Sequence, residues 1–394
     1  MTAMLTGQPQ SLGAGTAGYA LLPIERAHRG TAPWNDVHRL AQAITRHPAE
    51  AHPDAGGLFY GAAAVAFTLH TAGHPAYADA LATLDQAIDS MIRRRLTAAH
   101  QRIDAQRLPQ AAEYDLISGI SGLGAYLMHR HGDHPLLREC LTYLVRVTQP
   151  LDVNGEQLPG WWAAGSPDRR SHPRWGAGHA GFGMAHGIAG PLALLSAAMQ
   201  RAVTVDGHAT AIASLCAWLD RWRIGTGRNA CWPEIIDRDE WHAGRPKQTA
   251  PTRPSWCYGT PGIARAQHLA GLAVREPDRV HTAEQAMLGS ATDEQQLALL
   301  DSPGLCHGIA GLAYTLGSAA TDTGNPELRT AAAAALARMH QQDCGANDGL
   351  LEGTAGVLLT GIAGDIAQPA VSGWDTCLLV RGSTPYPPTR ETTT

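Results

Sequence analysis

The stretch Ser302-Pro-Gly-Leu-Cys-His-Gly-Ile-Ala-Gly-Leu-Ala-Tyr314 contains the motif around which the chain is organised. Its centre is a Cys-His pair followed by two glycines three residues apart, Gly308 and Gly311, at the start of an apolar run. Stretches of the same shape occur at 57–66, 114–124, 183–190, 255–262 and 350–356. The sequence therefore carries six recognisable copies of one motif.

The spacing of these copies predicts the fold. Their first glycines, at positions 61, 119, 187, 259, 308 and 353, are 45 to 72 residues apart. Each interval accommodates two helices, as the apolar periodicity indicates at 310–322 and 327–341. A repeat of this length is typical of stacked or closed arrays of helix pairs. Strand patterns are sparse and capping repeats are not evident, so we expect an all-α fold, an α/α toroid with about six inner and six outer helices.

We expect one toroid domain over residues 21–380. Residues 1–20 are rich in Gly, Ala and Thr with weak periodicity, and the tail 381–394 lacks a core-forming pattern, so both ends are predicted to be disordered. Two long loops are expected at 150–180 and 223–254, which are rich in Trp, Pro and charge. Loops of this kind commonly build a binding groove over one end of a scaffold.

Composition excludes several classes of protein. The net charge is −5, and Lys247 is the sole lysine, so no basic footprint for nucleic acid is present. The sequence shows neither a signal peptide nor an apolar run long enough to span a membrane. Its seven cysteines are odd in number and widely spread, which favours a reducing, cytoplasmic location. Five of them are expected to be buried core residues: Cys140, Cys216, Cys231, Cys344 and Cys377.

The other two cysteines occupy a repeated position. In a closed array, equivalent positions face the same end of the ring, and those just before the repeat glycine hold Tyr60, Ser118, His186, Cys257-Tyr258, Cys306-His307 and Glu352. Two thiolates and an imidazole favour Zn²⁺, and catalytic zinc sites keep three protein ligands and an open position. We therefore predict one zinc ion per chain, bound by Cys257, Cys306 and His307.

This ligand set suggests thiol chemistry. A substrate thiol at the open position would lose its proton, and a site with three sulfurs suits thiol alkylation better than hydrolysis. Addition of a thiolate to an activated alkene also needs a proton donor for the enolate, and His186 is the candidate, oriented by Asp115. Tyr258 and Arg253 are predicted to support the ligands or contact the enolate oxygen. His179 precedes a glycine-rich turn and is interpreted as structural.

At this point the motifs resemble a known family. Gly-Met-Ala-His186-Gly, Ser-Trp-Cys257-Tyr-Gly-Thr-Pro-Gly and Leu-Cys306-His307-Gly-Ile-Ala-Gly resemble the signature blocks of the LanC-type lanthipeptide cyclases, over nearly all of residues 40–380. The closing stretch 372–380 is similar to the family's C-terminal block.

The resemblance implies an α/α toroid with one zinc ion bound by Cys257, Cys306 and His307, and His186 with Asp115 as the acid/base pair. It implies addition of cysteine thiols of a dehydrated precursor peptide to dehydroalanine or dehydrobutyrine, giving lanthionine and methyllanthionine rings. The length fits a stand-alone cyclase, which implies a separate dehydratase as partner.

Two alternatives stay open from the sequence. A LanC-like protein that couples glutathione or another small thiol to an electrophile would use the same zinc site with a different groove. A zinc-dependent module that binds a cysteine-containing peptide without turnover would retain all binding in a His186→Ala variant.

Overall fold

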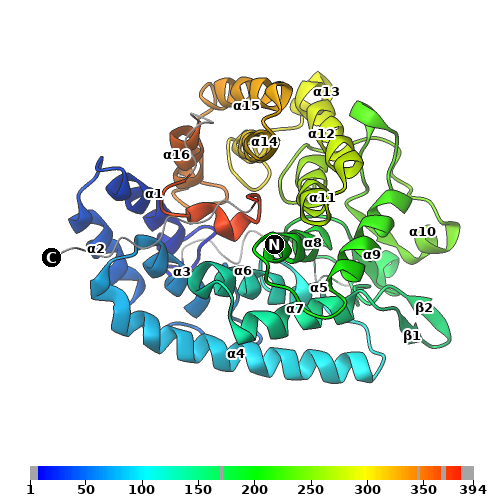
Figure 1. Ribbon diagram of the computed structural model, residues 1–394, viewed down its shortest axis with the longest axis horizontal. Coiled ribbons are helices and arrows are strands. Elements are labelled where there is room, and N and C mark those ends of the chain that lie inside the picture. The colour runs from blue at the N-terminus through cyan, green and yellow to red at the C-terminus, as the bar shows by residue number, and fades with distance from the viewer. Residues whose placement is uncertain (1–7, 169, 171, 344–346, 365–369, 383–394) are drawn as a thin grey trace.

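The computed structural model describes residues 8–168, 170, 172–343, 347–364 and 370–382, and over these it is a double ring of helices (Figure 1). The inner helices are α1 (Thr16–His28), α3 (Ala62–Ala72), α6 (Ile120–His131), α8 (Ala189–Gln200), α11 (Thr260–Val274), α14 (Ile309–Thr323) and α16 (Thr354–Ala363). Each contacts the next, and α16 contacts α1, so the ring closes. The α/α toroid predicted from the repeat is confirmed.

The outer ring is formed by helices that present only one face to the core: α2 (Trp34–Ile44), α4 (Ala78–Asp104), α7 (Pro135–Val147), α9 (His208–Arg221), α12 (Pro277–Thr292) and α15 (Pro326–Met339). The inner helix α3 has ten of its eleven residues buried, whereas the outer helix α2 has three of eleven. An all-round apolar helix is stable only inside a core, and an amphipathic one covers it. Helices α14 and α15 match the predicted 310–322 and 327–341 within two residues.

Shorter elements complete the chain. The helices are α5 (Ala111–Tyr114), α10 (Arg238–Ala243) and α13 (Glu294–Leu297), and the 3-10 helices are η2 (Pro75–Tyr77), η3 (Pro173–Trp175), η4 (Gly227–Asn229) and η5 (Trp374–Leu378). Strands β1 (Leu151–Val153) and β2 (Glu156–Leu158) form one antiparallel hairpin. Strands β3 (His179–Gly181) and β4 (Ile235–Asp237) pair antiparallel, with His179 opposite Asp237. The pairing of β3 with β4 joins the two segments predicted as long loops.

The prediction that residues 1–20 are disordered is wrong for the part that the structure describes. Helix α1 begins at Thr16, and Leu12, Ala17 and Leu21 are fully buried. The stretch Leu12-Gly-Ala-Gly15-Thr-Ala-Gly18 is a seventh copy of the motif, and its helix closes the ring between α16 and α3. The sequence of this copy is composed mainly of Gly, Ala and Thr and has little apolar periodicity, so it was not recognised. Its helix is stabilised by burial against α16 and α3 and not by intrinsic helix propensity.

The second glycine of each pair lies in a crowded position. A Cβ there would fall 1.9–2.7 Å from the carbonyl oxygen of the residue six positions earlier, in the loop of the same motif, as at Gly122, Gly262 and Gly311. It would also meet the neighbouring motif, at 3.0 Å from Leu58 Cβ for Gly122 and at 3.3 Å from Trp256 Cβ for Gly311. The glycine therefore lets each motif loop fold back on the first turn of its own helix.

The C-terminal segment fills the centre of the ring. In Figure 1, η5 lies inside the circle of inner helices. The Trp256 indole donates to the Leu378 carbonyl (3.1 Å), Arg265 Nε donates to the Val380 carbonyl (2.8 Å), and the Tyr314 hydroxyl donates to Asp375 (2.7 Å). Of the tail expected to be disordered, Arg381 is ordered by an ion pair with Asp375, and residues 383–394 lie outside the described residues.

Two further predictions concern burial and membranes. Cys140, Cys216, Cys231 and Cys377 are buried as expected, and Cys344 lies outside the described residues. Throughout the described part of the chain, helices are too short or too polar to cross a bilayer.

Candidate active site

A ring of backbone hydrogen bonds fixes the motif loops relative to one another. In each motif the carbonyl two residues before the first glycine accepts an N–H from a neighbouring motif, at 2.9–3.4 Å. The acceptors are Gly13, Phe59, Ile117, Ala185, Cys257, Cys306 and Leu351, and the last link, Leu351 N–H to Gly13, closes the circle. We call these seven bonds the hydrogen-bonded belt. It places equivalent residues of consecutive motifs side by side at one end of the toroid.

The belt brings the predicted ligands together. The Cys257 N–H donates to the Cys306 carbonyl (3.1 Å), so the two cysteines are direct neighbours in the belt. One ligand atom from each of Cys257, Cys306 and His307 lies within 4.8 Å of the other two. Two sulfurs and an imidazole at this separation are a suitable donor set for a metal ion, and zinc is the divalent ion that this combination favours.

The charges of the cluster are strongly linked. The pKa of Cys257 is lowered well below its usual range, first by its hydrogen bond with Cys306 and then by His307, against the effect of burial. The pKa of Cys306 is raised, chiefly by the neighbouring Cys257 sulfur. Hydrogen bonds with Cys257 and Glu352 raise the pKa of His307 to about 9. The cluster thus favours a thiolate at Cys257, the form in which cysteine binds metals.

Glu352, from the next motif along the belt, borders the cluster. Its buried Oε1 lies 2.8 Å from His307 Nδ1 and pairs with that imidazole. The absence of a side chain at Gly304 gives it room, since a Cβ there would lie 2.9 Å from the Leu351 carbonyl oxygen and 3.0 Å from Glu352 Oε2. The repeat analysis placed Glu352 in the equivalent position but did not select it as a site residue.

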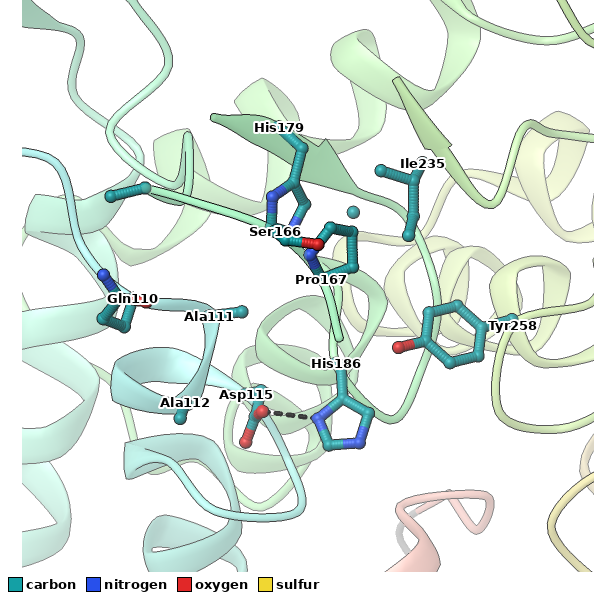
Figure 2. Close-up of a pocket in the computed structure, with 12 residues that line it drawn as sticks. Gln110, Ala111, Ala112, Asp115, Ser166, Pro167, His179, His186, Ile235 and Tyr258 are labelled. Carbon is teal, nitrogen blue, oxygen red and sulfur yellow. Dashed lines mark hydrogen bonds and ion pairs between the residues drawn. The ribbon is translucent and has the colours of Figure 1, made fainter. Parts of the chain in front are cut away.

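His186 and Asp115 form a second pair beside the cluster. His186 Nδ1 donates to Asp115 Oδ2 (2.6 Å), the dashed line in Figure 2. Asp115 is 1% exposed, and its Oδ1 also accepts from the backbone N–H groups of Ser118 (2.7 Å) and Gly119 (2.9 Å). The carboxylate thus caps the turn before α6 and orients the imidazole at once. Because a carboxylate only accepts, Nδ1 carries the proton and Nε2 is left to exchange one.

A pocket opens beside this pair (Figure 2). Its wall includes Asp115, His186, Tyr258 and His179, and the remaining lining residues are Gln110, Ala111, Ala112, Ala164, Ser166, Pro167, Gly181 and Ile235. Both segments predicted as long loops therefore contribute to it, through 164–181 and Ile235.

Tyr258 links the pocket to the cysteine cluster. It follows Cys257 in the chain, and its ring centroid lies 6.1 Å from that of His186. Burial, followed by the nearby Cys257 charge, raises the pKa of Tyr258, so the phenol keeps its proton and is a hydrogen-bond donor at neutral pH. The Ala185 N–H donates to the Cys257 carbonyl (3.1 Å), which fixes the loop of His186 against that of Cys257.

Arg253 is the predicted site residue whose side chain points elsewhere. Its side chain is 37% exposed, and its guanidinium lies 3.5 Å from Asp301. Arg253 is not among the residues that line the pocket. Its backbone carbonyl instead packs 2.4 Å from where a Cβ on Gly259 would be. In this structure Arg253 shapes the motif loop through its main chain.

Nearly the whole chain matches a known protein family. The family described as lanthionine synthetase C-like protein matches residues 7–379. The chain belongs to the lanthionine synthetase C-like family. The resemblance inferred from the motifs is confirmed.

Two named relatives give the extent of the similarity. The nisin biosynthesis protein NisC of Lactococcus lactis subsp. lactis is 25% identical over 264 residues, which span 65% of this chain and 60% of that relative. The solved structure of a nisin cyclase superposes with a TM-score of 0.80 at 20% identity, covering 95% of this chain and 92% of that one. The second comparison shows that the toroid fold is shared with a nisin cyclase.

Proposed function

We propose that the chain is a zinc-dependent lanthipeptide cyclase. It would add cysteine thiols of a dehydrated precursor peptide to dehydroalanine or dehydrobutyrine in the same peptide. Membership of the lanthionine synthetase C-like family supports the substrate class. The observation that carries the proposal is the juxtaposition, through the hydrogen-bonded belt, of the Cys257–Cys306–His307 cluster with the His186–Asp115 pair.

The donor set of the cluster fits zinc. Cys257, Cys306 and His307 would hold the ion and leave one coordination position open. When bound there, zinc would supply a Lewis acid that keeps a substrate thiol deprotonated at neutral pH. The chain's contribution is to hold both sulfurs and the imidazole within 4.8 Å before any ion arrives.

The remaining chemistry is proton transfer by the chain's own residues. The substrate thiolate forms a bond to the β-carbon of the dehydro residue, and the alkene π pair moves onto the α-carbon and its carbonyl. His186 Nε2 would first accept the proton that the substrate thiol loses, with Asp115 holding Nδ1–H and stabilising the charged ring. It would then deliver that proton to the α-carbon and return to the neutral form. The peptide loses the thiol proton and gains one at carbon, so its mass does not change.

Other parts of the proposal concern the neighbours of this pair. The protonated Tyr258 hydroxyl borders His186 in the pocket and would donate to the enolate oxygen. A similar contact from Arg253 would require its guanidinium to leave Asp301. Because dehydro residues are not coded, a separate dehydratase would have to supply the substrate.

The test combines metal analysis with an assay of ring formation. The purified protein should contain one zinc per chain, and a dehydrated cysteine-containing peptide should lose its free thiols without a change in mass. Cys257→Ala should lose the zinc, whereas His186→Ala should keep zinc and lose cyclisation. A mass gain from added glutathione in place of ring formation would favour a small-thiol transferase, and wild-type protein free of zinc would overturn both.

A further inference from the structure

Among the pocket residues, His179 has its backbone, its Nδ1 and its ring face held by contacts within the protein, whereas its Nε2 has no hydrogen-bond partner among the described residues. It lies in β3, and its backbone N–H and C=O both bond to Ala163 (2.9 and 2.7 Å). Its Nδ1 lies 2.9 Å from the Gly165 carbonyl oxygen, and Trp175 packs edge-on against the ring at 5.7 Å. The side chain is therefore held in one orientation before any substrate binds.

The hydrogen bond to Gly165 decides the tautomer of His179. A carbonyl oxygen only accepts, so Nδ1 must carry the proton and Nε2 must present a lone pair. Burial lowers the pKa of His179, which keeps the ring neutral near pH 7. A neutral ring with Nδ1–H donated inward is an acceptor at Nε2.

The Nε2 atom of His179 faces the pocket. His179 is only 3% exposed. Among the described residues no hydrogen bond reaches its Nε2, yet this nitrogen is not one of the fully buried polar atoms that lack a partner. The small exposed area therefore includes Nε2, on the pocket wall shared with His186 and Tyr258. Figure 2 shows His179 extending from its strand toward Ser166 and Pro167 at the rim. An oriented acceptor in a pocket lined by both polar and apolar side chains is a typical specificity element.

We propose that His179 is a substrate-binding residue whose Nε2 accepts a hydrogen bond from the peptide segment next to the reacting dehydro residue. The donor is either a backbone N–H or the hydroxyl of an unreacted Ser or Thr. Alanine and isoleucine side chains that line the same pocket, from Ala111, Ala112 and Ile235, would contact the apolar part of the same residue. This inference rests on the proposed function, because the ligand is the peptide on which the cyclase acts.

Two substitutions separate a binding role from a structural one. His179→Asn keeps an amide N–H near the position of Nδ1, able to donate to Gly165, but has no acceptor at the position of Nε2. His179→Gln places a carbonyl oxygen near the position of Nε2 and loses the inner bond. If His179 only supports the loop, Asn rescues function; if it binds substrate, Gln rescues binding.

The probe is a synthetic peptide that carries one dehydroalanine, a neighbouring serine and alanine in place of cysteine, so that binding is measured without turnover. We expect His179→Phe and His179→Asn to weaken binding about tenfold, the effect of one lost hydrogen bond, and His179→Gln to bind within about threefold of wild type. Two changes in the probe identify the donor: N-methylation next to the dehydroalanine removes the backbone N–H, and Ser→Ala removes the hydroxyl. The change that removes the true donor should weaken binding to the wild-type protein but not to His179→Phe.

His208 supplies a matched control. It is also a buried, neutral histidine that bonds a backbone carbonyl, that of Leu195 (2.9 Å), but it does not line the pocket. His208→Asn should leave peptide affinity unchanged. Wild-type affinity in His179→Phe, or rescue by Asn and not by Gln, would overturn the proposal. Failure of the wild-type protein to bind the probe or to form rings would instead count against the cyclase function itself.

Discussion

Replacing Asp115 by asparagine separates the two roles of its carboxylate. One oxygen accepts the N–H groups of Ser118 and Gly119 at 2.7 and 2.9 Å, and the other accepts His186 Nδ1–H at 2.6 Å. Asparagine can keep its carbonyl oxygen on the two backbone donors. It then turns its amide NH₂ toward His186, and this donor stabilises the tautomer with the proton on Nε2 and the lone pair on Nδ1.

The expected effects differ strongly in size. Because the cap survives, Asp115→Asn should lower the free energy of unfolding by only about 1 kcal/mol. Asp115→Ala leaves three donors without their acceptor and should cost about 3 kcal/mol or more. Cyclisation should fall by roughly 10²–10⁴-fold in Asp115→Asn, since general acid/base catalysis at Nε2 is lost. Zinc content should be unchanged, because Asp115 is not part of the cysteine cluster.

The assay measures single-turnover ring formation by thiol alkylation and mass spectrometry, together with chemical denaturation and metal analysis. Asp115→Asn combined with His186→Asn should be no slower than His186→Asn alone, because the two residues act as one unit. An Asp115→Asn enzyme within threefold of the wild-type rate would refute the assignment of His186 tautomer control to Asp115.

Three further predictions test other parts of the structure. Glu352→Gln should weaken zinc retention about 10- to 100-fold in competition with a chelator, because the carboxylate beside His307 is lost; wild-type retention would exclude such a role. Gly262→Ala should lower the free energy of unfolding by about 3 kcal/mol or more in denaturation experiments, because its Cβ would lie 1.9 Å from the Trp256 carbonyl oxygen. Gly324→Ala is the control: space is open there, so the cost should be about 1 kcal/mol. Burial, followed by the charge of Arg130, lowers the pKa of His70 from 6.5 to about 4, so its contribution to stability is present above pH 6.5 and is lost as pH falls toward 4, by up to roughly 3 kcal/mol. Between pH 7 and pH 5 the free energy of unfolding should therefore fall less in His70→Gln than in the wild-type protein. An equal fall in the two proteins would contradict this prediction.

Much of the architecture could be predicted from the sequence because the sequence repeats one motif. The glycine pair before each apolar run fixed the number and order of most inner helices, and equivalent positions in a closed ring must face the same end. That reasoning also selected Cys257, Cys306 and His307 as neighbours, and it placed His186 in the next motif. The repeat at Gly15 and Gly18 escaped notice because Gly- and Ala-rich sequence resembles disorder when its burial is unknown.

Tertiary structure alone decided the rest. The hydrogen-bonded belt joins residues tens to hundreds of positions apart, such as Leu351 with Gly13, and no local pattern encodes those pairings. Side-chain directions were equally hidden: Arg253 turns to Asp301, Glu352 turns to His307, and Asp115 serves a cap and an imidazole together. His179 looked structural because its sequence shows only a glycine-rich turn, whereas the pairing of β3 with β4 exposes one ring nitrogen to the pocket. Sequence thus set which groups meet at the mouth of the ring, and long-range packing set the direction in which each of them points.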